Sequence, residues 1–258
     1  MPGSSSGSPD PQGIFGRTLD LLGPEGFERL QRALVVVVGL GGVGSHAANA
    51  LVRAGVGRLR LVDFDRLTAS GLNRHLVARW GDVGRGKARS LAEHLGAVSA
   101  AVEVEPVEAF FHTDSAEEIL RGPPDFVVDA IDSFTPKVAL LSHCVAEGLP
   151  VVSSMGASAR TDPTLLRIGD LSQTRVCPLA RAVRRRLAKE GIRSGFPAVY
   201  SIEAPLPPLP PDDGDAVLSR GRVRNRLPSL SYMPGIFGYA AASVVILRLS
   251  GHAPGEAR

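Results

Sequence analysis

The sequence predicts an α/β protein with a doubly wound, mostly parallel sheet, in which a Rossmann-like nucleotide-binding half precedes a helical and irregular C-terminal extension. Two observations carry this prediction. Residues 33–38 form a continuous valine-rich run, which is typical of a strand buried on both faces of a parallel sheet. Short apolar runs then alternate with helical patterns along most of the chain, as in repeated βα units.

A glycine turn at residues 39–44 follows this first strand, and residues 46–54 continue as a helix. Glycines let the backbone approach a phosphate closely, and the start of a helix offers free N–H groups to it. The strand, turn and helix therefore predict nucleotide binding, and the alternative is a tight βα turn without a ligand. The glycines of the turn are Gly39, Gly41, Gly42 and Gly44.

An acidic residue stands where a nucleotide-binding unit needs one. Asp63 ends the next predicted strand, residues 58–62, and lies nineteen residues after Gly44. At that distance a carboxylate can accept a hydrogen bond from a ribose hydroxyl.

The remaining elements follow from periodicity. Helices are expected at 27–34, 81–95, 135–147, 178–189 and 233–247. The last of these is apolar but too short to span a membrane comfortably, and we expect it to be a buried helix. Strands are expected at 102–107, 125–131, 150–154, 165–168 and 196–203. The chain is accordingly divided into a disordered lead (1–13), a Rossmann-like nucleotide-binding half (14–156) and a substrate-facing part (157–250) with a long loop at 206–226.

Composition excludes several classes of protein. The 258 residues carry a net charge of only +3 and two cysteines, Cys144 and Cys177, which cannot build a four-thiolate zinc site. The N-terminal stretch has neither an apolar core nor an arginine-rich amphipathic pattern, so it is not a secretory signal or an obvious transit peptide. These features favour a reduced, cytoplasmic compartment.

Charged residues cluster at the predicted carboxyl edge of the sheet, where strand ends converge. Two cations and several carboxylates around a glycine turn suit a nucleoside triphosphate with Mg²⁺ better than a dinucleotide, because cations neutralise phosphate oxygens and a carboxylate holds the metal ion. The cations are Arg74 and Lys87, and the carboxylates are Asp63, Asp65, Asp129 and Asp132.

Each of these residues also has a simpler explanation. Arg74 and Lys87 can be solvated surface charges, although Lys87 is one of only three lysines among 29 basic residues. Lysine is the compact point charge that proteins use on phosphates, which favours a functional Lys87. Asp132 can cap the helix that follows it, and it can serve both roles.

The motifs together resemble the ThiF-like adenylating proteins related to ubiquitin-activating enzymes. The downstream half is similar to the tRNA threonylcarbamoyladenosine dehydratases within that superfamily. The resemblance covers residues 15–249. It rests on the strings VVGLGGVGS, VDFD, NRH, DVGRGK and DAIDSFTPKVALL, and further on DPT, DLSQT, PLARAVRRRL and VYSIEAP.

The resemblance implies ATP-dependent activation of the carboxylate of N6-threonylcarbamoyladenosine in tRNA, followed by ring closure with release of AMP and pyrophosphate. It implies that the glycine turn holds the phosphates and that Asp63, with Asp65 beside it, holds the ribose. Arg74 and Lys87 would neutralise the phosphates, and Asp132 would bind Mg²⁺. It also implies a homodimer and, as an option, sulfur-transfer partner proteins.

Three positions depart from the family pattern. Gly71 stands where the family usually has an asparagine that contacts phosphate. Ile14 stands where an arginine is common, and residues 231–233 lack a cysteine that some bacterial members carry. Activation through an adenylate needs no thiol, so the third difference leaves the predicted chemistry intact.

Two further features are open to more than one interpretation. Cys177, at a position where the family often has aspartate, is either a reactive thiol at a helix start or an incidental small residue. The basic helix at 178–189 either presents a solvated face or contacts the tRNA backbone, with three arginines on one face. These are Arg181, Arg184 and Arg185.

Three competing functions remain open at this level. An activator of a ubiquitin-like or sulfur-carrier protein uses the same adenylation chemistry, but its relatives commonly have C-x-x-C zinc ligands or an acceptor cysteine. An NAD-dependent oxidoreductase shares the glycine turn, but this chain has no evident hydride-transfer site. A non-catalytic nucleotide-binding scaffold is the third.

Overall fold

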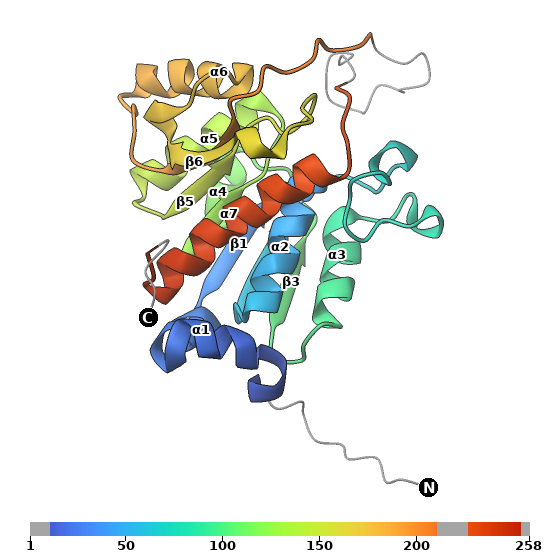
Figure 1. Cartoon of the computed structure of the whole chain (residues 1–258), viewed down its shortest axis with the longest axis vertical. Coiled ribbons are helices and arrows are strands. Elements are labelled where there is room, and N and C mark those ends of the chain that lie inside the picture. Colours follow the sequence, from blue (N-terminus) through green and yellow to red (C-terminus); the bar gives the residue numbers. More distant parts are fainter. Residues whose placement is uncertain (1–10, 211–226, 254–258) are drawn as a thin grey trace, which may run out of the picture.

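A computed structural model of the chain describes residues 11–210 and 227–253. Its centre is a seven-stranded sheet in the order β3-β2-β1-β4-β5-β7-β6, and of the described strands only β6 runs antiparallel to its neighbour (Figure 1). The predicted doubly wound, mostly parallel sheet is therefore confirmed. The strands are β1 (Leu34–Val38), β2 (Arg58–Val62), β3 (Glu103–Val107), β4 (Phe126–Asp129), β5 (Val151–Ser154), β6 (Leu166–Asp170) and β7 (Pro197–Ser201).

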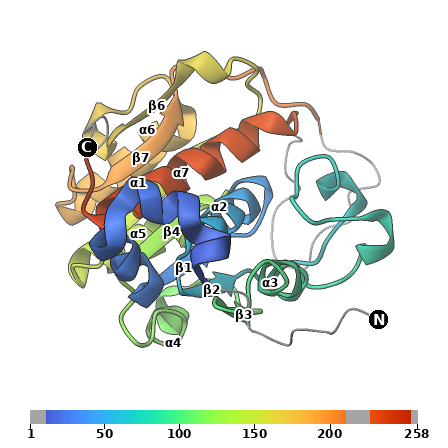
Figure 2. The same ribbon diagram turned by 60° about the horizontal axis from the view of Figure 1, so that its bottom comes forward.

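Helices cover both faces of the sheet (Figure 2). One face packs against α1 (Pro11–Arg32), α2 (Gly42–Ala54), α3 (Lys87–Gly96) and α7 (Tyr232–Ser250). The other packs against α4 (Ala116–Ile119), α5 (Phe134–Ala146) and α6 (Pro178–Leu187). Short 3₁₀ helices occupy Ala69–Gly71, Trp80–Asp82, Thr113–Ser115, Pro163–Leu165, Leu171–Gln173 and Ala188–Glu190.

The first helix is longer than predicted and starts earlier. Helix α1 begins at Pro11, inside the residues assigned to a disordered lead, and residues 1–10 lie outside the described part. It bends at Gly23, whose φ of 68° is left-handed, and Pro24 then restarts the helix. Because this break interrupts the apolar periodicity, the sequence predicted only the second half of α1.

Helix α3 starts later than predicted. It begins at Lys87 rather than Gly81, because Gly84 has a φ of 93° and cannot belong to a right-handed helix. Residues 66–86 instead form an irregular segment at the carboxyl edge of the sheet. Of the predicted loop at 206–226, residues 211–226 lie outside the described part.

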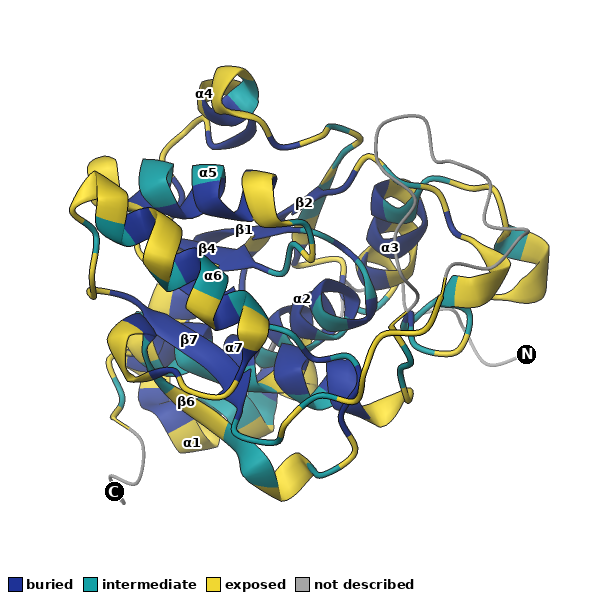
Figure 3. Cartoon of the chain, turned by 90° about the horizontal axis from the view of Figure 1, so that it is seen from above, coloured by how far each residue is buried: buried dark blue, intermediate teal, exposed yellow. Residues whose placement is uncertain are grey.

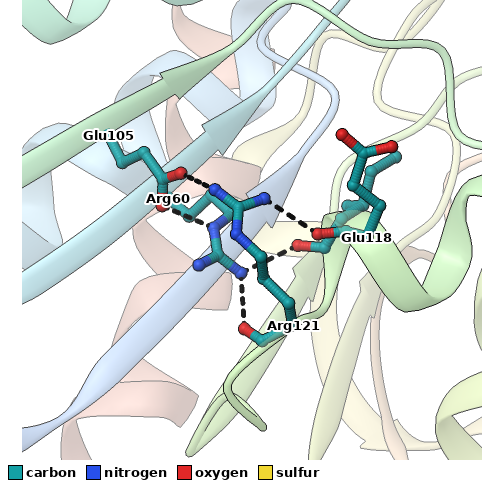
Figure 4. A network of polar contacts seen from close by, with 5 residues as sticks. Arg60, Glu105, Glu118 and Arg121 are labelled. Carbon is teal, nitrogen blue, oxygen red and sulfur yellow. Dashed lines mark hydrogen bonds and ion pairs between the residues drawn. The ribbon is translucent and has the colours of Figure 1, made fainter.

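Strand β2 carries a charged residue into the sheet. The Arg60 side chain is almost fully buried, and its guanidinium bonds Glu105 Oε2 on β3 at 2.7 Å (Figure 4). It also donates to the carbonyls of Ile119 and Arg121 at 2.9 and 2.8 Å. These bonds satisfy a buried charge and fix the end of α4 to the sheet edge.

Helix α7 is long and apolar enough to cross a membrane by length and composition, and half of its apolar window is buried inside the protein. Met233, Phe237, Ala241 and Val245 are fully buried against α2 and the sheet. Gly238 allows this contact, because a Cβ there would lie 2.4 Å from the Val43 carbonyl oxygen. The prediction of a buried C-terminal helix is confirmed.

Candidate nucleotide-binding site

The glycine turn joins β1 to α2 at the carboxyl edge of the sheet. A Cβ at Gly44 would lie 1.8 Å from the Gly39 carbonyl oxygen, and Gly39 has a φ of 89°, so both positions require glycine. A Cβ at Gly41 would meet no atom within 4 Å, so the backbone there faces open space. No side chain caps the N-terminus of α2, and its first N–H groups are free for an anion.

Asp63 ties the end of β2 to this turn. Its carboxylate accepts the Leu40 N–H at 2.7 Å through Oδ2 and the Asp65 N–H at 2.8 Å through Oδ1. Burial raises the pKa of Asp63, while the charge of Lys87 and the two backbone donors oppose that rise. Asp63 therefore shapes the turn itself, in addition to standing where a ribose hydroxyl is expected.

Lys87, the first residue of α3, folds back onto the same carboxylates. Its Nζ lies 2.8 Å from Asp65 Oδ2 and 3.8 Å from Asp63 Oδ2. The Lys87 N–H also donates to the Asp65 carbonyl at 3.0 Å, which fixes the start of the helix beside the end of β2. The two carboxylates after β2 and the lysine 22 residues beyond Asp65 thus form one cluster.

Arg74 reaches the turn from the irregular segment. It lines a small cavity of about 50 Å³ together with Gly41, Gly42 and Lys87, and it also lines a neighbouring cavity of about 390 Å³. Its guanidinium donates to the Ser70 carbonyl and to Asn73 Oδ1 at 2.7 and 3.0 Å and has no carboxylate partner among the described residues. Arg74 therefore brings an uncompensated positive charge to the glycine turn.

Two histidines beside Arg74 were not predicted to take part in the site. His75 lines both cavities, and burial lowers its pKa to about 4, helped by the charge of Lys87. Burial also lowers the pKa of His46. Both rings are neutral near pH 7, so the positive charge over the turn comes from Arg74 and Lys87.

Asp132 follows β4 on an exposed turn, and the N-cap position of the helix after it is Ser133, whose side chain makes no capping bond, rather than Asp132. The backbone of Ala130 and Ile131 packs onto Gly39, where a Cβ would lie 2.7 Å from the Ala130 carbonyl oxygen. This contact brings the turn that carries Asp132 against the glycine turn. Its carboxylate accepts the Ser133 hydroxyl at 3.4 Å and is open to solvent.

Asp129, one of the predicted carboxylates, forms an ion pair with a buried lysine, Lys137, to which the sequence analysis gave no role. Lys137 and Asp129 are both fully buried, with Nζ 2.5 Å from Oδ2, and Ser153 Oγ donates to the same oxygen at 2.5 Å. The other oxygen of Asp129 accepts the Ile131 N–H at 3.1 Å. The pair therefore holds the turn that leads to Asp132.

The predicted basic face on α6 is only partly available. Arg181 and Arg185 are exposed, whereas the Arg184 guanidinium bonds the carbonyl and hydroxyl oxygens of Thr174. Arg186 pairs with Glu190 one turn later. Helix α6 lies on the face of the sheet opposite α2, so these arginines are separate from the glycine turn (Figure 3).

Both cysteines are buried and neither forms a disulfide. Burial raises the pKa of Cys144 to about 12, which agrees with a core residue. Cys177 is 1% exposed at the start of α6. Its burial favours the interpretation as an incidental small residue.

The fold and the site together are those of a nucleotide-binding protein of the Rossmann-like type, with two cations at the glycine turn. Residues 15–258 match the ThiF family, and the chain belongs to that family. This family had been inferred from the residue motifs, and the match confirms it.

Two proteins with known names are similar to this chain in sequence. The chain is 41% identical to tRNA threonylcarbamoyladenosine dehydratase 2 of Saccharomyces cerevisiae over 247 residues, which cover 90% of this chain and 55% of that protein. It is 38% identical to the tRNA threonylcarbamoyladenosine dehydratase of Bacillus subtilis over 192 residues, 74% of this chain and 76% of that one. The chain thus spans about half the length of the yeast protein.

Solved structures agree with the sequence comparison. The crystal structure of the Escherichia coli tRNA N6-threonylcarbamoyladenosine dehydratase in complex with AMP matches with a TM-score of 0.83 and 31% identity, covering 93% of this chain and 95% of that one. The structure of the same enzyme with ATP matches with a TM-score of 0.81.

Proposed function

We propose that this protein is an ATP-dependent tRNA threonylcarbamoyladenosine dehydratase, which closes the threonylcarbamoyl side chain of the modified adenosine into its cyclic form. The observation that carries the proposal is the cavity over the glycine turn, where Arg74 and Lys87 meet Gly41 and Gly42. The names of the relatives and the ATP and AMP complexes of the E. coli enzyme support the same chemistry.

In this mechanism the substrate carboxylate attacks the α-phosphorus of ATP and pyrophosphate leaves. The free N–H groups at the start of α2, with Arg74 and Lys87, stabilise the negative charge that builds on the phosphate oxygens. The activated carbonyl is then attacked by the carbamoyl group of the same nucleoside, and AMP departs with one carboxylate oxygen. The substrate loses one water overall, and no protein nucleophile is needed.

The donor set near Asp132 fits Mg²⁺ held mainly by phosphates. No group of three or more metal-binding side chains occurs in the part of the chain that the structure describes. Mg²⁺ keeps several waters and is commonly bound by one or two carboxylates plus substrate phosphates, so one exposed carboxylate suffices. Asp132 would hold the ion, which would neutralise phosphate charge when bound.

Asp132→Asn should lower the rate of AMP formation by about 10²-fold or more, because the amide is a weaker ligand for a hard cation. The thermal unfolding midpoint should not change, since the side chain is exposed and does not cap α5. AMP formation is measured by chromatography across a Mg²⁺ titration. If the variant turns over at the parental rate at low Mg²⁺, Asp132 does not bind the metal ion.

The proposed activity is tested by incubating the full chain with ATP, Mg²⁺ and tRNA that carries threonylcarbamoyladenosine. Mass spectrometry of the nucleosides should show loss of one water, with one AMP and one pyrophosphate formed per product. A sulfur-carrier protein with a free C-terminus is the comparison acceptor. Adenylation of that acceptor without cyclisation of tRNA would establish the alternative function, and binding of NAD in preference to ATP would exclude both.

The exposed arginines of α6 are proposed to contact the tRNA backbone. Changing Arg181 and Arg185 to Gln should weaken tRNA binding across sequences and reduce the slope of log affinity against log salt by about two, one for each lost phosphate contact. Arg186→Gln is the matched control, because that side chain is already paired with Glu190. Identical salt curves for all three proteins would mean that this face is only solvated.

Three further expectations belong with this proposal. A homodimer is expected, and the exposed aromatic rings of Tyr232 and Tyr239 on α7 offer an apolar surface for it. Reduced thiols and a tRNA substrate fit a cytoplasmic location. Sulfur-transfer partner proteins stay a prediction from the family resemblance.

A further inference from the structure

The irregular segment between β2 and α3 ends in an unusual surface. Trp80, the single tryptophan of the chain, is 78% exposed, and Val83 beside it is 45% exposed. Figures 1 and 2 show the teal segment 66–86 projecting from the body of the protein beside α3. We call the exposed group formed by Arg66, Arg79, Trp80 and Val83 the Trp80 tip.

The base of this segment is held firmly although its tip is exposed. The Leu67 N–H donates to the Arg85 carbonyl at 2.8 Å, and the Gly84 N–H donates to the Leu67 carbonyl at 2.8 Å. Leu67 itself is 2% exposed and anchors the base in the protein. The backbone that carries Trp80 is therefore fixed relative to the nucleotide-binding site, and an aromatic ring is presented to solvent on a preorganised support.

The charges at the tip are positive and uncompensated. Among the described residues, Arg79 forms no ion pair, and the Arg66 guanidinium donates to the Gly84 carbonyl at 2.7 Å without a carboxylate partner. Arg85, in contrast, is paired with Asp82 and Glu93 at 3.2 and 2.6 Å. An exposed aromatic ring on a segment that also carries two arginines without ion pairs among the described residues suits a partner that has both flat aromatic groups and negative charges.

The chain on either side of the Trp80 tip leads to the cavity over the glycine turn. Trp80 lies between Arg74 and Lys87 in the chain, and these two residues line the cavity over the glycine turn. A partner bound at the tip therefore contacts the same segment that carries Arg74 to the glycine turn. Figure 3, which looks down on the carboxyl ends of the parallel strands, shows α3, the helix that this segment precedes, and α6 on opposite sides of α2.

We propose that the Trp80 tip binds an unpaired nucleotide of the tRNA, with the base stacked on Trp80 and the neighbouring phosphates on Arg79 and Arg66. This inference rests on the proposed tRNA substrate and assigns the surface that positions its loop. Bases in loops can splay out and stack on aromatic side chains, whereas paired bases cannot. The tip therefore selects a loop over a duplex.

The single tryptophan allows a direct test with the full chain. Trp80 emission should be quenched by tRNA and by a single-stranded RNA oligonucleotide, and a duplex of the same length should leave it unchanged. Trp80→Ala should weaken tRNA affinity by about tenfold, the usual effect of losing one base stack, with the salt dependence retained. Trp80→Phe should keep most of the affinity, and Arg79→Gln should reduce the salt slope by about one.

Leu21→Ala is the matched control, because Leu21 is 71% exposed on α1 at the opposite end of the sheet. Affinity for ATP should be equal in all variants, since Trp80 lines neither cavity. If the parent cyclises the tRNA while Trp80 emission stays constant, this inference is overturned and the proposed function stands. Emission that changes with protein concentration in the absence of RNA would overturn it in favour of a contact between two copies.

Discussion

Lys87→Met should strongly reduce the rate of AMP formation while the protein stays folded. We expect a fall of about 10²- to 10³-fold, the typical loss when one preorganised positive or hydrogen-bonding group is removed from a developing oxyanion. Lys87 supplies this charge beside Arg74, and its Nζ lies 2.8 Å from Asp65 Oδ2. Without it, Asp63 and Asp65 would repel the phosphates of an ATP bound at the glycine turn.

The matched control for this change is Lys189→Met, because Lys189 is exposed in the short helix after α6 and lies outside both cavities. It should retain the parental rate. Thermal unfolding of both variants shows whether the fold survives, and isothermal titration with ATP separates lost binding from lost chemistry. A Lys87→Met protein that turns over at the parental rate would contradict the role assigned to this residue.

Lys137→Met should cost about 3–5 kcal/mol of unfolding free energy, because it leaves the Asp129 carboxylate buried without its countercharge. Both side chains are fully buried, and Lys137 Nζ also donates to the Ser154 carbonyl at 2.9 Å. Ser153 remains as a hydrogen-bond donor to Asp129, but a hydroxyl does not neutralise a carboxylate in the interior. Urea unfolding of the parent and the variant, fitted with one m-value for both, measures the lost free energy of unfolding.

Two further variants test whether the unpaired charge of Asp129 causes this loss of stability. Changing Asp129 to Leu together with Lys137 to Met removes both charges and should recover more than half of the lost stability. Arg32→Met breaks an exposed pair with Glu28 and should cost about 1 kcal/mol or less. If the single change at Lys137 costs no more than the change at Arg32, the buried pair does not stabilise the fold.

The Lys137 variant should also lose activity beyond what its stability explains. Asp129 holds the Ile131 N–H, and the backbone of Ala130 and Ile131 packs on Gly39. A loosened turn displaces Asp132 and the glycine turn together. AMP formation measured well below the unfolding temperature should therefore be lower in Lys137→Met than in the parent.

Local patterns in the sequence were sufficient to predict the strands and the glycine turn of the N-terminal half. A valine-rich run, closely spaced glycines and Asp63 at the end of the next strand are short-range features, and each has a direct conformational or chemical cause. Lys87 and Arg74 were also found, because parallel strands bring their carboxyl ends to one edge. The structure places both residues in one cavity with Gly41 and Gly42.

Other features depended on contacts between residues far apart in the chain. The burial of Lys137 depends on how α5 packs over the ends of β4 and β5, and the bond from Arg184 to Thr174 depends on the loop before α6. Nothing in their local sequence distinguishes these side chains from solvated ones. The sequence by itself determined the glycine turn and the strands on either side of it, because backbone sterics and apolar periodicity act locally. Only the tertiary structure decided which charges are buried and paired and which, like Arg79 beside Trp80, are left for a partner, because the cost of a charge depends on everything that surrounds it.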